Sequence, residues 1–95
     1  MRVVFRSKDF AGVMAAGLGF NNRRPMADPW RYQGRVQHRD WRGTFECYWE
    51  GADDPTRRTA TELVWTVRGD ARLFGLAAAL KSLGYTVEVS QDEEK

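Results

Sequence analysis

The stretch that most constrains this chain is residues 30–49, WRYQGRVQHRDWRGTFECYW, in which polar and apolar residues alternate through two runs. Side chains on a β-strand point alternately to its two faces, so this alternation predicts two strands, each with one buried face. The residues Asp40-Trp41-Arg42-Gly43 predict the turn between them, since glycine suits the left-handed conformation that closes such loops. The stretch therefore predicts a β-hairpin with a tryptophan at its tip.

Pairing Arg39 with Thr44 sets the register that we expect for this hairpin. The apolar face then holds Tyr32, Gly34, Val36, His38, Phe45, Cys47 and Trp49. On the other face Arg35 meets Tyr48, a cation–ring pair, and Gln37 meets Glu46. A slip of one residue would turn three polar side chains into the core, so the alternation specifies the faces well.

Two segments predict amphipathic helices. The first begins at Ser7, which is expected to be the N-cap, and runs to about Leu18. The second is capped by Asp70 and ends before Gly84, the expected C′ residue. Its apolar positions recur at helical spacing: Leu73, Leu76, Ala77, Leu80 and Leu83.

The remaining segments predict further strands and loops. Alternation predicts strands at Arg2–Arg6, Thr59–Arg68 and Tyr85–Ser90, with Leu63, Trp65 and Val67 inward. Residues 19–29 and 51–58 predict loops, and 91–95 an acidic, disordered tail. The order β-α-β-β-β-α-β predicts one α+β domain over residues 1–90. We expect a mostly antiparallel five-stranded sheet with two helices on one face, a layout similar to a ferredoxin-like fold with an extra strand.

Length and composition place the chain among small soluble proteins. Ninety-five residues with 42% apolar content can bury a single core. The only cysteine is Cys47, so no internal disulfide can form, and a reducing, cytoplasmic setting is expected. The chain opens on Arg2-Val3-Val4-Phe5 without a leader pattern, and its apolar runs are too short for a bilayer.

The residues predict no catalytic centre, metal site or cofactor. His38 and Cys47 share a predicted face, but both point to the apolar side and no third residue orients the histidine. One histidine with one cysteine falls short of the four ligands of a zinc site. Asp53 and Asp54 lack the further carboxylates of a calcium loop. A non-enzymatic protein is therefore expected.

Arginine is the residue type that best predicts a binding surface. The chain has 15 basic residues, mostly arginines, and a net charge of +2. Arginine binds carboxylates and phosphates and stacks on rings, although a G+C-rich genome would raise its frequency too. The candidate binding residues are Trp41 and Arg42 at the tip, Arg23, Arg24 and Arg31 near the loop, and Arg35, Arg39 and Tyr48 on the polar face. Alternatively, that face is only solvated and held by cross-strand ion pairs.

These features predict a small binding module that acts stoichiometrically on another protein. The size is typical of adaptors or inhibitors from phages and mobile elements. The alternative is nucleic-acid binding through the same arginines and aromatic residues, and a homodimer is a third option. If Trp41 is an exposed anchor, Trp41→Ala should leave folding nearly intact; if it is core, the change should destabilise the fold.

Overall fold

The computed structural model describes residues 1–27, 31–50 and 62–91. Within these ranges the elements are β1 (Arg2–Ser7), α1 (Phe10–Ala15), β2 (Phe20–Pro25), β3 (Arg31–Gln37), β4 (Arg42–Trp49), β5 (Leu63–Gly69), α2 (Leu73–Ser82) and β6 (Val87–Ser90). The predicted loop at 51–58, the start of the predicted strand at 59–61, Trp30 and the tail residues 92–95 lie outside the described residues.

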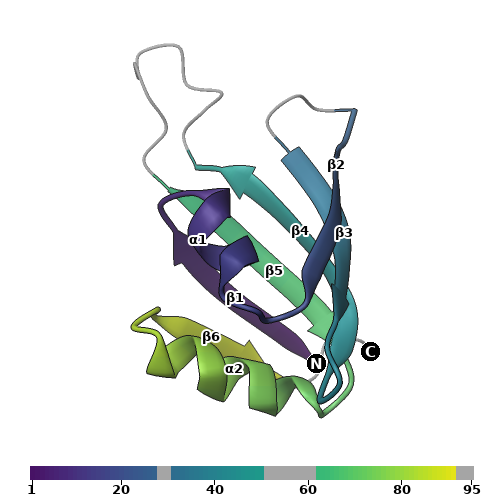
Figure 1. The fold of residues 1–95 in the computed structure, drawn as a ribbon, viewed down its shortest axis with the longest axis vertical. Coiled ribbons are helices and arrows are strands. Elements are labelled where there is room, and N and C mark those ends of the chain that lie inside the picture. The colour runs from purple at the N-terminus through teal and green to yellow at the C-terminus, as the bar shows by residue number, and fades with distance from the viewer. Residues whose placement is uncertain (28–30, 51–61, 92–95) are drawn as a thin grey trace.

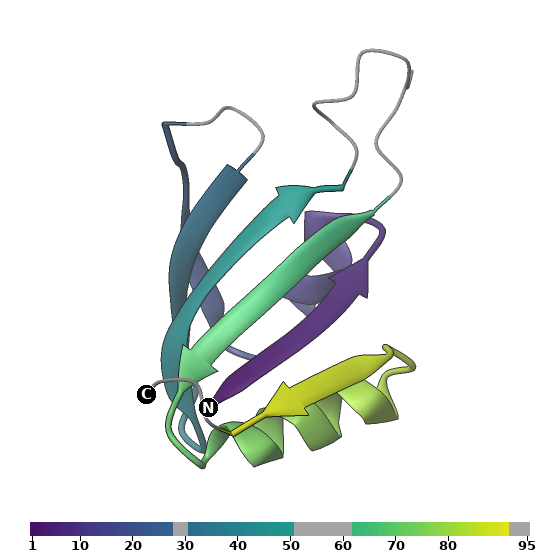
Figure 2. The same ribbon diagram turned by 180° about the vertical axis from the view of Figure 1, so that it is seen from behind.

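The described strands form one open sheet with the order β2-β3-β4-β5-β1-β6. Every neighbouring pair is antiparallel. Strands β2 to β5 follow one another as a meander, whereas β1 inserts between β5 and β6 (Figure 1). Both helices cover the same face of the sheet, and the view from behind shows the opposite face without a helix over it (Figure 2). The prediction of an antiparallel α+β fold with two helices is confirmed.

The expected count of five strands is wrong, because residues that were predicted as a loop form β2. The pairing of β2 with β3 shifts between Asn21 and Arg24, where a bulge places an extra residue on β2. Such a bulge breaks the alternation of period two, so the segment reads as irregular in sequence. Phe20 anchors the strand, since its buried ring lies 5.2 Å from the rings of both Phe45 and Trp65.

The core lies between the sheet and the helices. Trp65 is fully buried at its centre and stacks on Phe5 at 5.5 Å between ring centroids. Its indole Nε1 donates a hydrogen bond of 2.8 Å to Oγ of Ser7, which in turn donates to the carbonyl of Asp9. Helix α2 contributes Leu73, Leu76, Ala77 and Leu80, and β5 contributes Leu63 and Val67, as predicted.

The helix ends differ from the prediction at several positions, and the N-cap position of α2 is Arg72, not Asp70. Asp9, not Ser7, caps α1, because its Oδ1 accepts the hydrogen bond from the Gly12 amide at 3.0 Å. Helix α1 stops at Ala15 instead of reaching Leu18. Leu83 is 54% exposed and does not join the core. Gly84 has a φ of 99°, which confirms its expected left-handed conformation after α2.

The predicted hairpin exists as β3 and β4, but its turn and its register were wrong. The turn comprises residues 38–41, closed by a hydrogen bond from the His38 amide to the Trp41 carbonyl at 3.0 Å. Gly34 pairs with Phe45 and Gln37 with Arg42, a slip of four residues from the expected register. A slip by an even number of residues preserves the alternation, so the strand residues still face the predicted sides. No helix in the described ranges is long and apolar enough to cross a membrane.

Candidate binding site on the outer sheet face

The face of the sheet that the helices leave uncovered, called the outer face here, carries most of the predicted site residues. Arg31, Arg35, Arg42 and Tyr48 all alternate with buried or half-buried residues of β3 and β4, which places them on this face. Arg68 on β5 and Arg2 on β1 belong to the same face by their pairing. Tyr48 is the only aromatic residue that the described strands turn outward.

A hollow of about 330 Å³ lies on this face. Its lining residues are Arg24, Gln33, Gly34, Arg35, Thr44, Phe45 and Glu46. Gly34 and Phe45 pair across β3 and β4 with the Phe45 ring turned inward, so their backbones form the floor. Their sequence neighbours point outward and form the walls, and the bulge in β2 brings Arg24 opposite Gln33.

The floor of the hollow requires glycine at position 34. A Cβ there would lie 2.6 Å from the carbonyl oxygen of Asn21 and 2.6 Å from two ring carbons of Phe45. Such distances are far below van der Waals contact, so any side chain would displace β2 or the ring. Because Gly34 has no side chain, the β2 backbone at Asn21 and the Phe45 ring can both pack closely against β3 at this position.

Beside the hollow, Arg31 and Tyr48 form a cation–π pair. The guanidinium carbon of Arg31 lies 4.8 Å from the centroid of the Tyr48 ring. The expected partner of Tyr48 was Arg35, but the four-residue slip sets Arg35 opposite Thr44 instead. Tyr48 is half-buried, and with the exposed Arg31 it forms an aromatic–cation pair next to the hollow.

Few ion pairs between described residues lie on this face. Among the described residues of the outer face, Arg6 forms an ion pair with Glu50, with 3.4 Å between Nε and Oε1. Arg24, Arg35, Arg42 and Arg68 have no described carboxylate within the 4.0 Å of a salt bridge. Glu46 in the hollow has no such partner among the described residues either. Within the described ranges, the alternative of a face held by ion pairs is represented by Arg6 and Glu50.

Trp41, the expected tip anchor, is a core residue. Its side chain is only 7% exposed, and its indole Nε1 donates a buried hydrogen bond of 2.9 Å to the carbonyl of Leu18. The His38 ring stacks on it at 3.9 Å between centroids with an interplanar angle of 7°. The indole also reaches α2, where a Cβ on Gly75 would lie 3.2 Å from Cε3 of Trp41. The turn therefore folds its tryptophan inward.

Three other candidates lie away from the hollow. Arg23 extends over the helix side, with its guanidinium carbon 4.0 Å from the Phe10 ring centroid and 5.6 Å from that of Tyr32. Arg23 and Arg24 are adjacent in sequence, and their side chains therefore lie on opposite faces of the sheet. Arg39 lies in the 38–41 turn with its side chain 89% exposed. Arg42 is exposed on the outer face, at the turn end of β4.

His38 and Cys47 do not form a catalytic pair. His38 lies in the turn instead of facing the core, and its Nδ1 accepts a hydrogen bond of 3.0 Å from the Asp40 amide. Cys47 pairs with Tyr32 in the sheet and is buried. Burial raises the pKa of its thiol to about 12, only partly opposed by the charge of Arg23, so no thiolate forms near neutral pH. The described residues contain no cluster of three or more potential metal ligands.

The sequence alone did not single out the other walls of the hollow. Gln33 and Glu46 were expected on the polar face and Thr44 opposite Arg39, and only the observed register brings all three around Gly34 and Phe45. A glycine in the middle of a strand was the available signal, because such glycines mark bulges or close backbone approach.

No protein-family model matches the chain, and no curated protein or solved structure shows significant similarity to it.

Proposed function

We propose that this protein is a small non-enzymatic binding module that acts stoichiometrically on another protein, as an adaptor or inhibitor. The observation that carries the proposal is the hollow on the outer face, with the Arg31–Tyr48 pair beside it. The contact residues would be Arg24, Arg31, Arg35 and Tyr48, with Arg42 at the margin. Trp41 is no longer among them, because its side chain is buried.

The polarity of the hollow supports a protein partner. Its walls combine the two cations of Arg24 and Arg35 with the Glu46 carboxylate, the Gln33 amide and the Thr44 hydroxyl. A protein surface offers acids, bases and amides within a few ångströms, so it can satisfy such a mixed set. A phosphate backbone offers only anions, and Glu46 would repel it. Arginine and tyrosine are also the residues that most often dominate binding energies at protein interfaces.

A photo-crosslinking experiment tests this proposal. We would place p-benzoylphenylalanine at position 33, in the wall of the hollow, and at Ala78, which is exposed on α2. Irradiation in extracts of the native host should give one discrete protein adduct from position 33 and none from position 78. Arg35→Glu should abolish the adduct, whereas Arg39→Glu, the same charge change in the turn, should retain it. Equal adducts from both positions, or indifference to Arg35→Glu, would exclude this face.

The alternative function is nucleic-acid binding through the same face. The observation in its favour is the set of Arg35, Arg42 and Arg68 on three neighbouring strands, which have no ion-pair partner in the part of the chain that the structure describes. Against it, Tyr48 is the single outward aromatic of the described strands and Arg31 already stacks on it, whereas single-strand binders use several free rings. Fluorescence anisotropy with short DNA and RNA across a salt series separates the two functions. Three phosphate contacts would give a slope of roughly −2 to −3 in log affinity against log salt.

A reducing, cytoplasmic setting is part of the same proposal. The buried thiol of Cys47 supports it, because a free cysteine is compatible with a compartment in which disulfides do not form. Fluorescence microscopy of the tagged protein in its host tests the location.

A further inference from the structure

Two arginines that the docking proposal does not use, Arg2 and Arg68, lie directly opposite each other on β1 and β5. Side chains opposed in this way on one face have their Cβ atoms only about 4.5–5.5 Å apart, and like charges there destabilise the sheet. The next strand on each side adds one more residue to this row across the sheet: Thr44 on β4 is opposite Arg68, and Ser90 on β6 is opposite Arg2. We call this set, Thr44–Arg68–Arg2–Ser90, the arginine row.

No described carboxylate neutralises the arginine row. Neither guanidinium has a carboxylate of the described residues within the 4.0 Å of a salt bridge. The nearest acids along the sheet are Glu46 and Glu88, which lie in the next row, opposite Thr66 and Val4. They stand diagonal to the arginines, at a separation of roughly 7–8 Å between Cα atoms. The row therefore places two cations between two hydroxyl groups.

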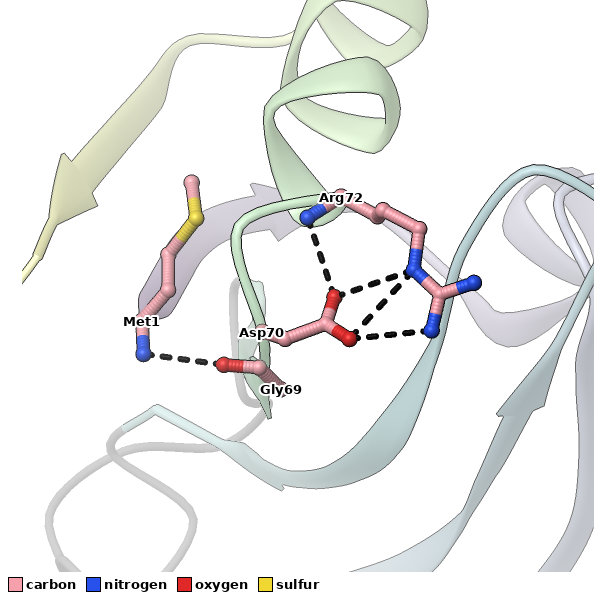
Figure 3. A network of polar contacts seen from close by, with 4 residues as sticks. All are labelled: Met1, Gly69, Asp70 and Arg72. Carbon is pink, nitrogen blue, oxygen red and sulfur yellow. Dashed lines mark hydrogen bonds and ion pairs between the residues drawn. The ribbon is translucent and has the colours of Figure 1, made fainter.

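The acid that follows Arg68 in sequence is held by another arginine. Asp70 accepts hydrogen bonds from the Arg72 amide at 3.0 Å and from Nη2 of Arg72 at 3.0 Å, as Figure 3 shows. The Met1 ammonium is likewise bound, since it donates a hydrogen bond of 2.9 Å to the Gly69 carbonyl. Asp70 is thus paired with Arg72 and the Met1 ammonium is bound to a neutral carbonyl, so neither group offsets the charge of the row.

The Nε group of Arg2 gives an independent indication of a ligand. It is buried and has no hydrogen-bond partner among the described residues. A shielded donor on a charged group is costly unless an acceptor reaches it, so such a group points to a bound oxyanion or water. An oxyanion held between Arg2 and Arg68 would satisfy this donor and remove the repulsion between the two guanidinium groups at once.

We propose that the arginine row is a binding site for a phosphate monoester group. Two guanidinium groups match the charge of about −1.5 to −2 that such a group carries at pH 7. Guanidinium forks bind phosphate oxygens through paired hydrogen bonds, and the Thr44 and Ser90 hydroxyls add a donor at each side. A carboxylate or a phosphodiester carries a single negative charge and matches the pair less well. The site goes beyond the docking proposal, since a small ligand would occupy it with or without a protein partner.

NMR titration of the full chain tests this site, with the Nε–Hε signals of the arginines as the readout. Phenyl phosphate and inorganic sulfate are the ligands, each in low-salt buffer between pH 5 and pH 7.5. We expect saturable shifts of the Arg2 and Arg68 signals. The affinity for phenyl phosphate should rise about tenfold across this range as its second proton, with a pKa near 6, is lost. The affinity for sulfate, which stays a dianion, should remain unchanged.

Three variants complete the test. Arg2→Gln and Arg68→Gln should each lower the affinity for phenyl phosphate at least tenfold, whereas Arg39→Gln, the same charge change in the exposed turn, should retain it. Arg68→Gln should also raise the melting temperature in low-salt, phosphate-free buffer, because it removes the repulsion. Shifts spread evenly over all arginines, equal losses in the Arg39→Gln control, or a lower melting temperature of Arg68→Gln would overturn the proposal.

Discussion

Replacing Trp41 tests the finding that the hairpin turn belongs to the core. Trp41 is only 7% exposed. About 200 Å² of its mostly apolar surface therefore leaves water on folding. At about 25 cal/mol per Å² this burial is worth about 5 kcal/mol. Tryptophan-to-alanine changes in cores cost about 3–5 kcal/mol, a large fraction of the 5–15 kcal/mol that a typical domain has. Trp41→Ala should therefore lower the melting temperature by about 15–30 °C.

Two further variants separate the contributions to this loss. Trp41→Phe keeps most of the apolar contact but leaves the Leu18 carbonyl without its indole donor, which should cost about 1–3 kcal/mol. Phe74→Ala, at a side chain that is 48% exposed on α2, should cost less than about 1 kcal/mol. Urea unfolding followed by far-UV circular dichroism measures all three. If Trp41→Ala unfolds at the same urea concentration as Phe74→Ala, the indole is not part of the core and our account of the turn is wrong.

Other variants test single contacts. Gly75→Ala should stabilise α2 by less than the roughly 1 kcal/mol expected from helix propensity, because the new methyl lies 3.2 Å from Cε3 of Trp41. In a Trp41→Ala background this close contact is absent, so the same change should give the full gain in the free energy of unfolding, measured in urea. Cys47 should stay unreactive to Ellman's reagent at pH 8 until urea unfolds the chain, and rapid labelling of the native protein would contradict its burial. Hydrogen bonds from Arg72 hold the pKa of Asp70 below its ordinary 3.8, so the contact stabilises the fold above that pH and is lost as the pH falls through the lowered pKa. Arg72→Gln should raise the pKa of Asp70 in an NMR titration, and an unchanged value would refute the assignment.

Alternation and helical spacing predicted most of the core but could not fix the strand pairing. Leu63, Trp65 and Val67 face inward as expected, because each strand must bury one face whatever its neighbour is. The register of β3 and β4 could not be chosen this way, since the observed slip of four residues leaves every side chain on the same face. The turn composition favoured Gly43 as the closing residue, whereas Gly43 lies within β4 opposite Gly69. A Cβ there would collide with the Arg68 carbonyl oxygen, so close strand approach, not turn geometry, accounts for this glycine.

The candidate site was only partly predictable for the same reason. Tyr48 and Arg35 follow from alternation, which is a property of one strand at a time. The hollow depends on the bulge in β2 and on the pairing of Gly34 with Phe45, which are relations between strands. Trp41 was misassigned because a turn position was taken to mean exposure, although its indole packs beneath the turn against α2 and Leu18.

The position of β1 in the sheet has a consequence for how the chain folds. Strands β2 to β5 pair with their neighbours in sequence, so their contacts are local and can form early. Strand β1 pairs only with β5 and β6, and Phe5, for example, is opposite Trp65 and Val87. During synthesis the backbone of β1, which includes Val3 and Phe5, therefore has no partner strand until β5 has emerged from the ribosome. Its apolar residues are exposed throughout that interval, so we expect the docking of β1 onto β5 to be a late step in folding.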